Sequence, residues 1–371
     1  MDDRPSTRRL TDIGMIDHAK ETAKETAKEA ARALRRRYFP LQDSLIGMFG
    51  RLLRRSNLVR EHIAAADPLK DSGRVAIYVH FDPDGQVDDY VVHQVSALAD
   101  AGFRVTFVSN SPTLPHDSRA RISAFCKDII WRFNTGYDFG AYKDGIASIS
   151  NLDRLDGLLL MNDSVYGPFR QLREVLSRLD GSTADFWGIA DSFEYQHHIQ
   201  TFFMFFFPAA LQTPAFGRFW ARLPYVNHKP WVIRNGEVGL SQRLYRAGLR
   251  SGVLAPYWSV AEKMKARLED MKGNAPPQSQ QPGFARFQSR ILGNRAVNPM
   301  QYFWDILITD YGCPFIKREL IQLNPAGIPF LSRWRAVVAS RSEYDTSMIE
   351  RHLQRLARRD GHDANPAVIS P

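Results

Sequence analysis

Three polar side chains, Asn162, Asp163 and Ser164, stand at the end of the apolar run GLLLM. A short apolar run bounded by turn residues predicts a buried strand. A carboxylate at the carboxyl end of a parallel strand could hold a divalent cation and a nucleotide diphosphate. The same residue types also make turns and cap helices. The two interpretations differ in what they require of the neighbouring strands.

Polar side chains also close the two strands expected earlier in the chain. His80 and Asp82 follow the run RVAIYV, and Ser109 and Asn110 end the run FRVTFVSN. Helical patterns at 88–102 and 116–128 separate these strands from each other and from a third strand at 129–134. This series predicts an α/β, Rossmann-like fold with a mostly parallel sheet and helices on both faces. Because ligands of such sheets bind beyond the carboxyl ends of the strands, we expect these side chains to share one site.

The third strand leads into NTGYDFGAYKDG, which carries Asn134, Asp138 and Lys143. Gly136 and Gly140 permit a tight turn and a close backbone approach. The three polar side chains could then face the ribose and phosphates of a nucleotide. The alternative is a loop that caps a helix expected at 141–152. No G-x-G-x-x-G follows a strand and no G-x-x-x-x-G-K-[ST] occurs, which argues against a dinucleotide-binding fold and a P-loop.

Further candidates lie in the second half of the chain. Glu237 is expected in the first turn of a helix that begins at Asn235, where the helix dipole favours a carboxylate but lowers its pKa. A lowered pKa does not help a general base, and Asp191, after DFWGI, is the rival. His198 could be a metal ligand, although a single histidine at a strand start is more often structural. The run TFFMFFF that follows is too short to cross a bilayer and predicts a buried strand.

Composition limits the class of protein. The chain has 371 residues, 44% hydrophobic and 12% aromatic, which predicts a globular chain with a substantial core. The two cysteines, Cys126 and Cys313, lie far apart in the sequence and match no metal-ligand spacing. This argues against a disulfide framework and favours a reducing compartment. The first residues lack an apolar signal region, and no apolar stretch is long enough to span a membrane. We therefore expect a cytoplasmic protein.

Charge is concentrated near the N-terminus. Of the net +9, +6 falls in residues 1–60, with fourteen Lys and Arg against eight Asp and Glu. The rest is nearly balanced, so nucleic-acid binding is not expected. A helix is expected at 19–39 and another at 41–59, the second with an apolar face and with arginines elsewhere on its surface. Such a helix could lie on an anionic membrane, or pack on the protein or on another copy.

Six motifs occur together in a fixed order: RFNTGYDFGAYKDG, NDSVYGPF, DFWGI, HIQTFFMFF, EVGLSQRLYRAG and GCPFIKRELIQLNP. The set resembles the rhamnan synthesis protein F family, over about residues 74–325. More distantly, the layout is similar to that of GT-A glycosyltransferases. The resemblance implies an inverting glycosyltransferase that moves L-rhamnose from dTDP-L-rhamnose to a lipid-linked glycan of a cell-surface polysaccharide such as lipopolysaccharide. The alternatives are another nucleotide sugar as donor, or a degenerate transferase that scaffolds an assembly complex.

The resemblance also implies roles for single residues. Asp163 would hold Mg²⁺ or Mn²⁺ and the diphosphate, with His198 as a further ligand, and Glu237 or Asp191 would deprotonate the acceptor. This chain has Asn-Asp-Ser in place of Asp-x-Asp, and Val238 replaces the second acid of the usual Glu-Asp pair. The nucleotide sugar is expected to contact His80, Asp82, Ser109, Asn110, Asn134, Asp138, Lys143, Asn162 and Ser164.

The domain organisation follows from these patterns. Residues 1–60 are expected to form a basic helical extension at the inner face of the cytoplasmic membrane. Residues 74–330 would form the transferase domain, with a nucleotide-sugar half at 74–170 and an acceptor half at 171–330. Residues 331–371 would add a C-terminal helix and a disordered tail.

Overall fold

The computed structural model describes residues 41–50, 58–64, 73–271 and 283–360, in two compact units, 1–54 and 55–371. Within the first unit, residues 41–50 are helical, as expected. The helix expected at 19–39 lies outside the described residues. Among the described helices, none is both long and apolar enough to cross a membrane.

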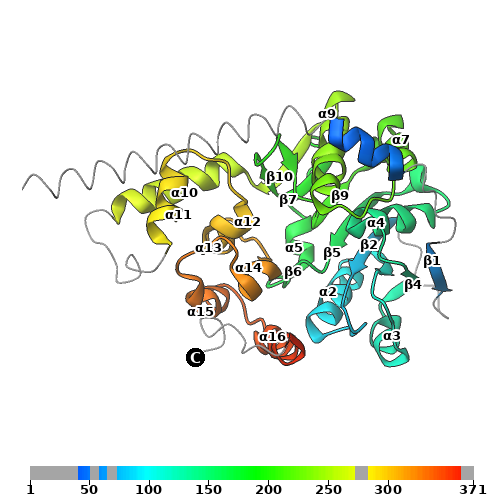
Figure 1. The fold of residues 1–371 in the computed structure, drawn as a ribbon, viewed down its shortest axis with the longest axis horizontal. Coiled ribbons are helices and arrows are strands. Elements are labelled where there is room, and N and C mark those ends of the chain that lie inside the picture. Colours follow the sequence, from blue (N-terminus) through cyan, green and yellow to red (C-terminus); the bar gives the residue numbers. More distant parts are fainter. Residues whose placement is uncertain (1–40, 51–57, 65–72, 272–282, 361–371) are drawn as a thin grey trace, which may run out of the picture. The chain divides into compact units, whose positions relative to one another are not determined.

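The second unit is built on a mixed sheet with the strand order β1-β4-β3-β2-β5-β9-β7-β10 (Figure 1). Strands β4, β3, β2 and β5 are parallel to one another, β10 is parallel to β7, and β1, β8 and β9 run antiparallel to their neighbours. The predicted α/β class with a mostly parallel sheet is therefore confirmed. The strands are β1 (Val59–Ala64), β2 (Arg74–His80), β3 (Arg104–Ser109), β4 (Cys126–Arg132), β5 (Gly157–Asn162), β7 (Phe186–Ser192), β8 (His198–Ile199), β9 (Phe203–Phe206) and β10 (Ser251–Ala255).

Helices cover both faces of the parallel part. Helices α2 (Asp89–Asp100) and α3 (His116–Ser123) pack in the same cluster as Tyr78 and Phe107. Helix α4 (Tyr137–Ala147) packs on the opposite face, against Ile77, the neighbour of Tyr78 on β2. The contact is close, since a Cβ added at Gly145 would lie 2.7 Å from the Ile77 side chain. Neighbouring residues of a strand point to opposite faces, so the two sets of helices enclose the sheet. Strands covered in this way read as continuous apolar runs.

The apolar run at 201–207 contains β9, which is fully buried between β5 and β7. The prediction of a buried strand is confirmed. Around it lie short elements: η1 (Leu152–Arg154), α5 (Leu172–Leu176), α6 (Pro208–Gln212), α7 (Pro214–Arg222), α8 (Lys229–Val232), the π-helix η2 (Ile233–Val238) and α9 (Gly239–Arg246).

The last third of the chain returns to the sheet. Strand β11 (Ile316–Lys317) pairs with β6 (Val165–Tyr166), directly after β5. Helix α16 (Ser347–Asp360), the basic helix expected near the C-terminus, lies against α2 (Figure 1). The remaining elements are α10 (Tyr257–Asp270), α11 (Phe284–Leu292), α12 (Pro299–Tyr302), α13 (Trp304–Thr309), α14 (Arg318–Leu323), η4 (Leu331–Arg333) and α15 (Trp334–Ala339).

Four expected boundaries were wrong. Helix α4 begins at Tyr137 rather than 141, because Gly136 adopts φ +86° and turns the chain into the helix there. Strand β4 begins at Cys126, inside the expected helix 116–128. The helix expected to reach Val59 does not, since 59–64 form edge strand β1 with alternating exposure. The helical segment around Glu237 begins at Lys229, eight residues before that carboxylate.

Candidate active site

Asp163 lies where the strand order reverses. Strands β2, β3 and β4 follow one another outward, and the chain then crosses back to place β5 on the other side of β2. Ligands of open α/β sheets bind in the crevice at this switch point. The backbone N–H of Phe81, just after β2, donates to Oδ2 of Asp163 at 3.2 Å. The carboxylate is buried and linked to the ends of both central strands.

Arg318 is the cation beside Asp163. Its Nη1 donates to Oδ2 of Asp163 at 2.9 Å and to the hydroxyl of Tyr90, on α2, at 2.7 Å. The pairing of β11 with β6 brings Arg318 here, and its backbone N–H donates to the carbonyl of Ser164 at 2.8 Å. The ion pair thus joins residues 155 positions apart in the chain.

Asn162, Ser164 and Asp138 form a hydrogen-bonded group next to this ion pair. The amide Nδ2 of Asn162 donates to Oδ2 of Asp138 at 3.0 Å, and the hydroxyl of Ser164 donates to Oδ1 of Asn162 at 2.5 Å. Asp138 is in the first turn of α4. Gly140 lets α4 start this close to the preceding loop, because a Cβ there would lie 2.2 Å from the carbonyl oxygen of Thr135. The fold therefore brings four predicted residues together, with Asp163 the fourth.

The electrostatic setting of Asp138 is unusual for a carboxyl group. Burial and the negative charge of Asp163 raise its pKa from 3.8 to about 7, although the charge of Arg318 lowers it and that of Glu237 adds to the rise. The group therefore holds its proton to a much higher pH than an ordinary aspartic acid does. A neutral carboxyl can lie near a diphosphate without the repulsion that a carboxylate would meet.

Glu237 lies on the π-helix η2. Its Oε1 accepts from the backbone N–H of Thr201 at 2.9 Å and from the Thr201 hydroxyl at 3.3 Å. The Tyr142 hydroxyl, from α4, donates to the Thr201 carbonyl at 3.1 Å. Gly236 makes the position possible, because a Cβ there would lie 2.9 Å from the ring of Phe139. Single π-turns of this kind are frequent at functional sites.

The predicted residues at the ends of β2 and β3 are hydrogen-bonded within the protein. The ring of buried His80 contacts the Ser109 hydroxyl at 3.3 Å through Nδ1 and the Gln86 carbonyl at 3.1 Å through Nε2. Burial lowers the pKa of His80, so the ring is neutral at physiological pH. Asn110 accepts from Arg132 at 2.5 Å through Oδ1 and donates to the carbonyl of Tyr137 at 3.2 Å. These hydrogen bonds fix the three side chains at the ends of β2 and β3.

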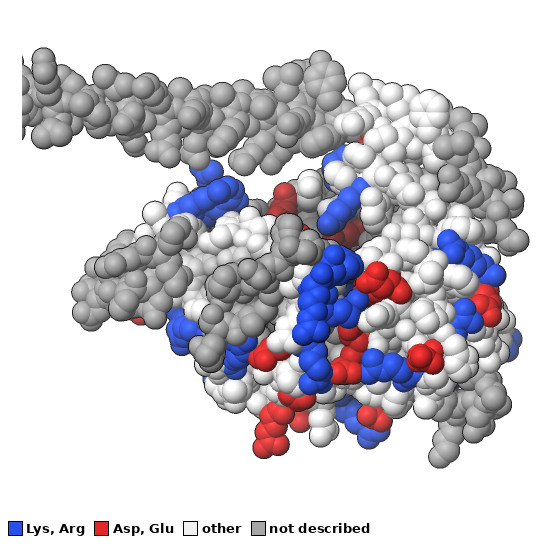
Figure 2. Space-filling view, turned by 60° about the horizontal axis from the view of Figure 1, so that its bottom comes forward, with Lys and Arg blue, Asp and Glu red and all other residues white. Residues whose placement is uncertain are grey.

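Asp82 is held by the C-terminal helix. Nη2 of Arg355, on α16, donates to Asp82 at 2.5 Å and to Asp88 at 2.6 Å. Figure 2 shows a column of basic side chains over α16, bordered by acidic ones. Among the described residues, Asp82, Asp88 and His352 are the one group of three whose ligand atoms lie close enough for a metal ion. The guanidinium of Arg355 already bridges its two carboxylates, so a divalent cation does not fit there.

Of the four other predicted residues, three contact different partners and one is exposed. Asp191 accepts from the backbone N–H of Tyr257 at 2.7 Å and contacts Nε2 of His197 at 2.9 Å, so both of its oxygens are used. Lys143 donates to the Leu223 carbonyl at 2.6 Å, His198 contacts the Gln196 carbonyl at 2.8 Å through Nδ1, and Asn134 is exposed. Across the described segments, no hydrogen bond or ion pair joins any of these four to Asp163.

A divalent cation does not fit beside Asp163 either. The guanidinium of Arg318 lies 2.9 Å from the carboxylate of Asp163. A divalent cation bound to this carboxylate would be repelled by the positive charge of Arg318 at that distance. The neighbouring carboxyl of Asp138 has a pKa raised to about 7, which makes it a poor metal ligand at neutral pH. His198, the other predicted ligand, makes no described contact with this group.

Sequence reasoning did not find several residues that shape the site. Tyr90 and Thr201 position Arg318 and Glu237, and buried Arg132 donates to Asp144, Asn110 and the Thr135 carbonyl. The buried Arg132 has no local sequence signal, since its side-chain partners Asp144 and Asn110 lie 12 and 22 residues away.

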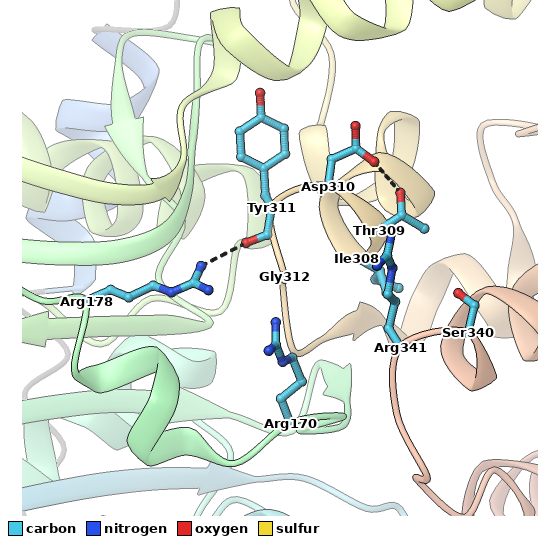
Figure 3. A pocket seen from close by; sticks show the side chains of 9 residues that line it. All are labelled: Arg170, Arg178, Ile308, Thr309, Asp310, Tyr311, Gly312, Ser340 and Arg341. Carbon is cyan, nitrogen blue, oxygen red and sulfur yellow. Dashed lines mark hydrogen bonds between the residues drawn. The ribbon is translucent and has the colours of Figure 1, made fainter.

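An arginine-lined pocket of about 360 Å³ lies apart from these residues (Figure 3). Arg170 and Arg178 flank Gly312, and Arg178 donates to the carbonyl of Tyr311 at 3.3 Å. None of the predicted site residues lines this pocket. Its lining residues are Arg170, Arg178, Ile308, Thr309, Asp310, Tyr311, Gly312, Ser340 and Arg341.

Comparison with known proteins finds a family that matches the part of the chain in which most of the six motifs lie. Residues 105–266 match the family model described as Rhamnan synthesis protein F. The resemblance to the rhamnan synthesis protein F family is confirmed. The matched span includes Ser109, Asp138, Asp163, Asp191 and Glu237.

Two bacterial relatives align with about half of the chain. The "Uncharacterized protein y4gN" of Sinorhizobium fredii (strain NBRC 101917 / NGR234) is 34% identical over 191 residues, which are 50% of this chain and 49% of the relative. The "Virulence protein VirA" of Vibrio anguillarum (strain ATCC 68554 / 775) is 32% identical over 211 residues, 56% of this chain and 66% of the relative. The chain thus spans less than two thirds of either protein.

Solved structures with a partial likeness include the glycosyltransferase GlyE of Streptococcus pneumoniae TIGR4, with a TM-score of 0.38 and 10% identity over 76% of this chain and 64% of that one. The galactosyltransferase LgtC gives a TM-score of 0.28 and 10% identity over 48% of this chain and 72% of that one. The strand order described above, rather than these loose superpositions, defines the fold.

Proposed function

We propose that the protein is a glycosyltransferase that uses a nucleotide sugar. The observation that carries the proposal is the group at the switch point of the sheet. Asp163 pairs with Arg318, Asn162 is hydrogen-bonded to Asp138, and Glu237 lies on the π-helix η2. The match to the rhamnan synthesis protein F family supports it. We further propose dTDP-L-rhamnose as the donor and a lipid-linked glycan as the acceptor, in the synthesis of a rhamnose-containing surface polysaccharide such as lipopolysaccharide.

The transfer needs one base and one group that accepts charge on the diphosphate. The acceptor hydroxyl oxygen forms a bond to C1 of the sugar, and its proton goes to a carboxylate. The bond from C1 to the diphosphate oxygen breaks, and its electron pair stays on that oxygen. A single displacement of this kind inverts the configuration at C1.

Glu237 is the proposed base. One oxygen is fixed by Thr201, while Oε2 accepts no hydrogen bond from the described residues. Asp191, the rival, uses both oxygens on the backbone of Tyr257 and on His197. A base must reach the proton that it removes before its pKa matters, so the fixed geometry favours Glu237.

Release of dTDP tests the proposal. Purified protein with dTDP-L-rhamnose and a range of lipid-linked acceptors should release dTDP. Glu237→Gln should lower kcat by about 10²- to 10⁴-fold, because an amide cannot accept the proton. Glu350→Gln, which alters a half-buried carboxylate paired with Arg335, is the control and should leave kcat unchanged. If only other nucleotide sugars are turned over, the proposed donor is wrong.

The Asp163–Arg318 ion pair also supports the non-catalytic alternative, because a carboxylate held by arginine need not take part in chemistry. In that case Asp163→Ala and Glu237→Ala would leave glycan synthesis in cells intact while deletion of the gene abolishes it. Loss of synthesis in either variant, with the protein folded, would favour the enzyme.

We propose that the N-terminal region holds the protein at the inner face of the cytoplasmic membrane. Leu45, Met48 and Phe49, on the helix of residues 41–50, are exposed by 53%, 46% and 57%. Residues 1–60 carry +6 of the net charge. An exposed apolar face beside basic residues is typical of a helix that lies on an anionic membrane surface.

A further inference from the structure

GT-A enzymes of the kind that the motifs resemble place a divalent cation against the leaving diphosphate, where it neutralises developing charge. The corresponding acid here is Asp163, and its partner is Arg318, 2.9 Å away. The inference below rests on the proposed glycosyltransferase function.

We propose that the guanidinium of Arg318 takes the place of the metal and binds the diphosphate of the donor, so that the protein binds and uses its nucleotide sugar without a divalent cation. In the transfer step, the electron pair left on the diphosphate oxygen is then stabilised by a fixed positive charge of the chain itself.

Arg318 has donors to spare for this role. A guanidinium carries five N–H donors, and both contacts to side chains, with Asp163 and Tyr90, come from Nη1. No described residue accepts from Nε or Nη2. The Arg318 side chain is 22% exposed. Its Nε and Nη2 are not fully buried, so solvent can reach both nitrogens. These N–H groups are in reach of solvent and of a ligand, and a planar guanidinium suits paired phosphate oxygens.

The position of Arg318 is fixed from three sides. Asp163 supplies the opposite charge, Tyr90 supplies a hydroxyl, and the backbone N–H of Arg318 is tied to the Ser164 carbonyl. A cation held in place before the reaction stabilises developing charge without reorganisation. Asp163 is then a positioning residue for Arg318 rather than a metal ligand, which accounts for one acid where Asp-x-Asp would offer two.

Calorimetric titration of the full chain with dTDP, in EDTA and in Mn²⁺, tests the inference. Wild-type protein should bind dTDP with the same Kd in both, and Arg318→Gln should raise Kd at least tenfold, a loss that Mn²⁺ does not restore. Arg318→Lys, which keeps the charge but not the paired donors, should fall between. Arg267→Gln is the matched control, since it breaks a 2.6 Å ion pair with Asp305 that has similar burial, and it should leave Kd unchanged.

The outcomes separate the two proposals. Wild-type binding that requires Mn²⁺, or wild-type affinity in Arg318→Gln, overturns the inference and leaves the glycosyltransferase proposal standing. Absence of binding by dTDP and by other nucleoside diphosphates, with and without metal, overturns the proposed function itself. If Arg318→Gln does not fold, Asp163→Asn with Arg318→Gln removes both charges of the pair together. This double variant should fold and bind dTDP at least tenfold more weakly, with or without Mn²⁺, and wild-type affinity in it overturns the inference.

Discussion

At the residue scale, Asp138 shows how position changes an ordinary carboxyl group. Burial and the negative charge of Asp163 raise its pKa, Glu237 adds to the rise, and the Asn162 amide donates one hydrogen bond to it. The native protein therefore keeps a proton on Asp138 that the unfolded chain releases near pH 4. Two consequences follow, one for stability and one for ligand binding.

The stability consequence has a definite sign. Because the native state binds the extra proton, the free energy of unfolding should fall as the pH rises from about 4 to about 7, and level off above. Asp138→Asn should remove this fall and stabilise the protein at pH 8 by about 1–3 kcal/mol. Urea unfolding at several pH values measures both. Asp117→Asn, at a fully exposed site, should retain the fall.

Ligand binding should depend on the same proton. Above pH 7 the ionised Asp138 adds a negative charge near the proposed diphosphate site, so the Kd of dTDP should rise between about pH 6 and pH 8. Asp138→Asn should bind dTDP with little pH dependence over this range. A variant with the slope of the wild type would mean that another group titrates.

At the element scale, the π-helix between α8 and α9 decides where Glu237 lies. Its six residues, Ile233–Val238, pack Gly236 against the face of Phe139. Phe139 in turn stacks on Trp220 with ring centroids 5.8 Å apart. A regular α-helix through this segment would turn Glu237 to another side, because each residue of a helix advances by about 100°.

Gly236→Ala tests this packing. The added methyl would meet three ring carbons of Phe139 at 2.9–3.0 Å, so we expect a loss of about 1–3 kcal/mol in the free energy of unfolding, together with lower transferase activity. Gly217→Ala, in α7 with no atom within 4 Å of the added methyl, should instead gain about 0.5–1 kcal/mol. Equal effects in denaturant unfolding would contradict the proposed role of the contact.

At the scale of the whole molecule, ion pairs join α16, in the C-terminal part of the second unit, to the segment that follows β2. Arg355 bridges Asp82, Asp84 and Asp88. Burial raises the pKa of Asp82, but the hydrogen bonds from Arg355 and from backbone N–H groups lower it below its usual value. The stabilisation from Asp82 is therefore present above about pH 4 and is lost as the pH falls further.

Arg355→Ala should cost about 3–5 kcal/mol, because it leaves two largely buried carboxylates without their cation. Arg351→Ala, one turn away on α16, removes an exposed pair with Asp89 and should cost at most about 1 kcal/mol. Thermal or urea unfolding of both proteins gives the comparison, and similar losses would show that α16 is held by its apolar contacts instead.

The N-terminal region gives the last prediction. Each basic residue near an anionic leaflet contributes about 1 kcal/mol, so the intact chain should bind anionic vesicles at low salt and leave them at high salt. Leu45→Ser with Met48→Ser and Phe49→Ser should weaken vesicle binding while dTDP affinity stays the same. A truncation should remove residues 1–54, because 59–64 form β1 and pair with β4. An intact chain that ignores anionic vesicles would point to packing or oligomerisation.

The sequence by itself determined the parallel core of the sheet and the place of Asn162, Asp163 and Asp138 at its carboxyl end. Apolar runs, strand–helix alternation and glycine positions are local signals, and backbone geometry translates them directly into strands and turns. The ends of elements were predicted less well: the left-handed turn at Gly136 moved the start of α4, and β1 was not predicted at all.

Tertiary structure alone decided what Asp163 and Glu237 contact. The sequence marked Asp163 as a metal ligand and Glu237 as the opening of a helix, whereas β11–β6 pairing places Arg318 on the first and a π-turn places the second beside Thr201. These contacts join segments 36 and 155 residues apart. No periodicity reports such partners, because long-range pairing depends on how the whole chain packs, and so the charge balance of the site appears only once the fold is complete.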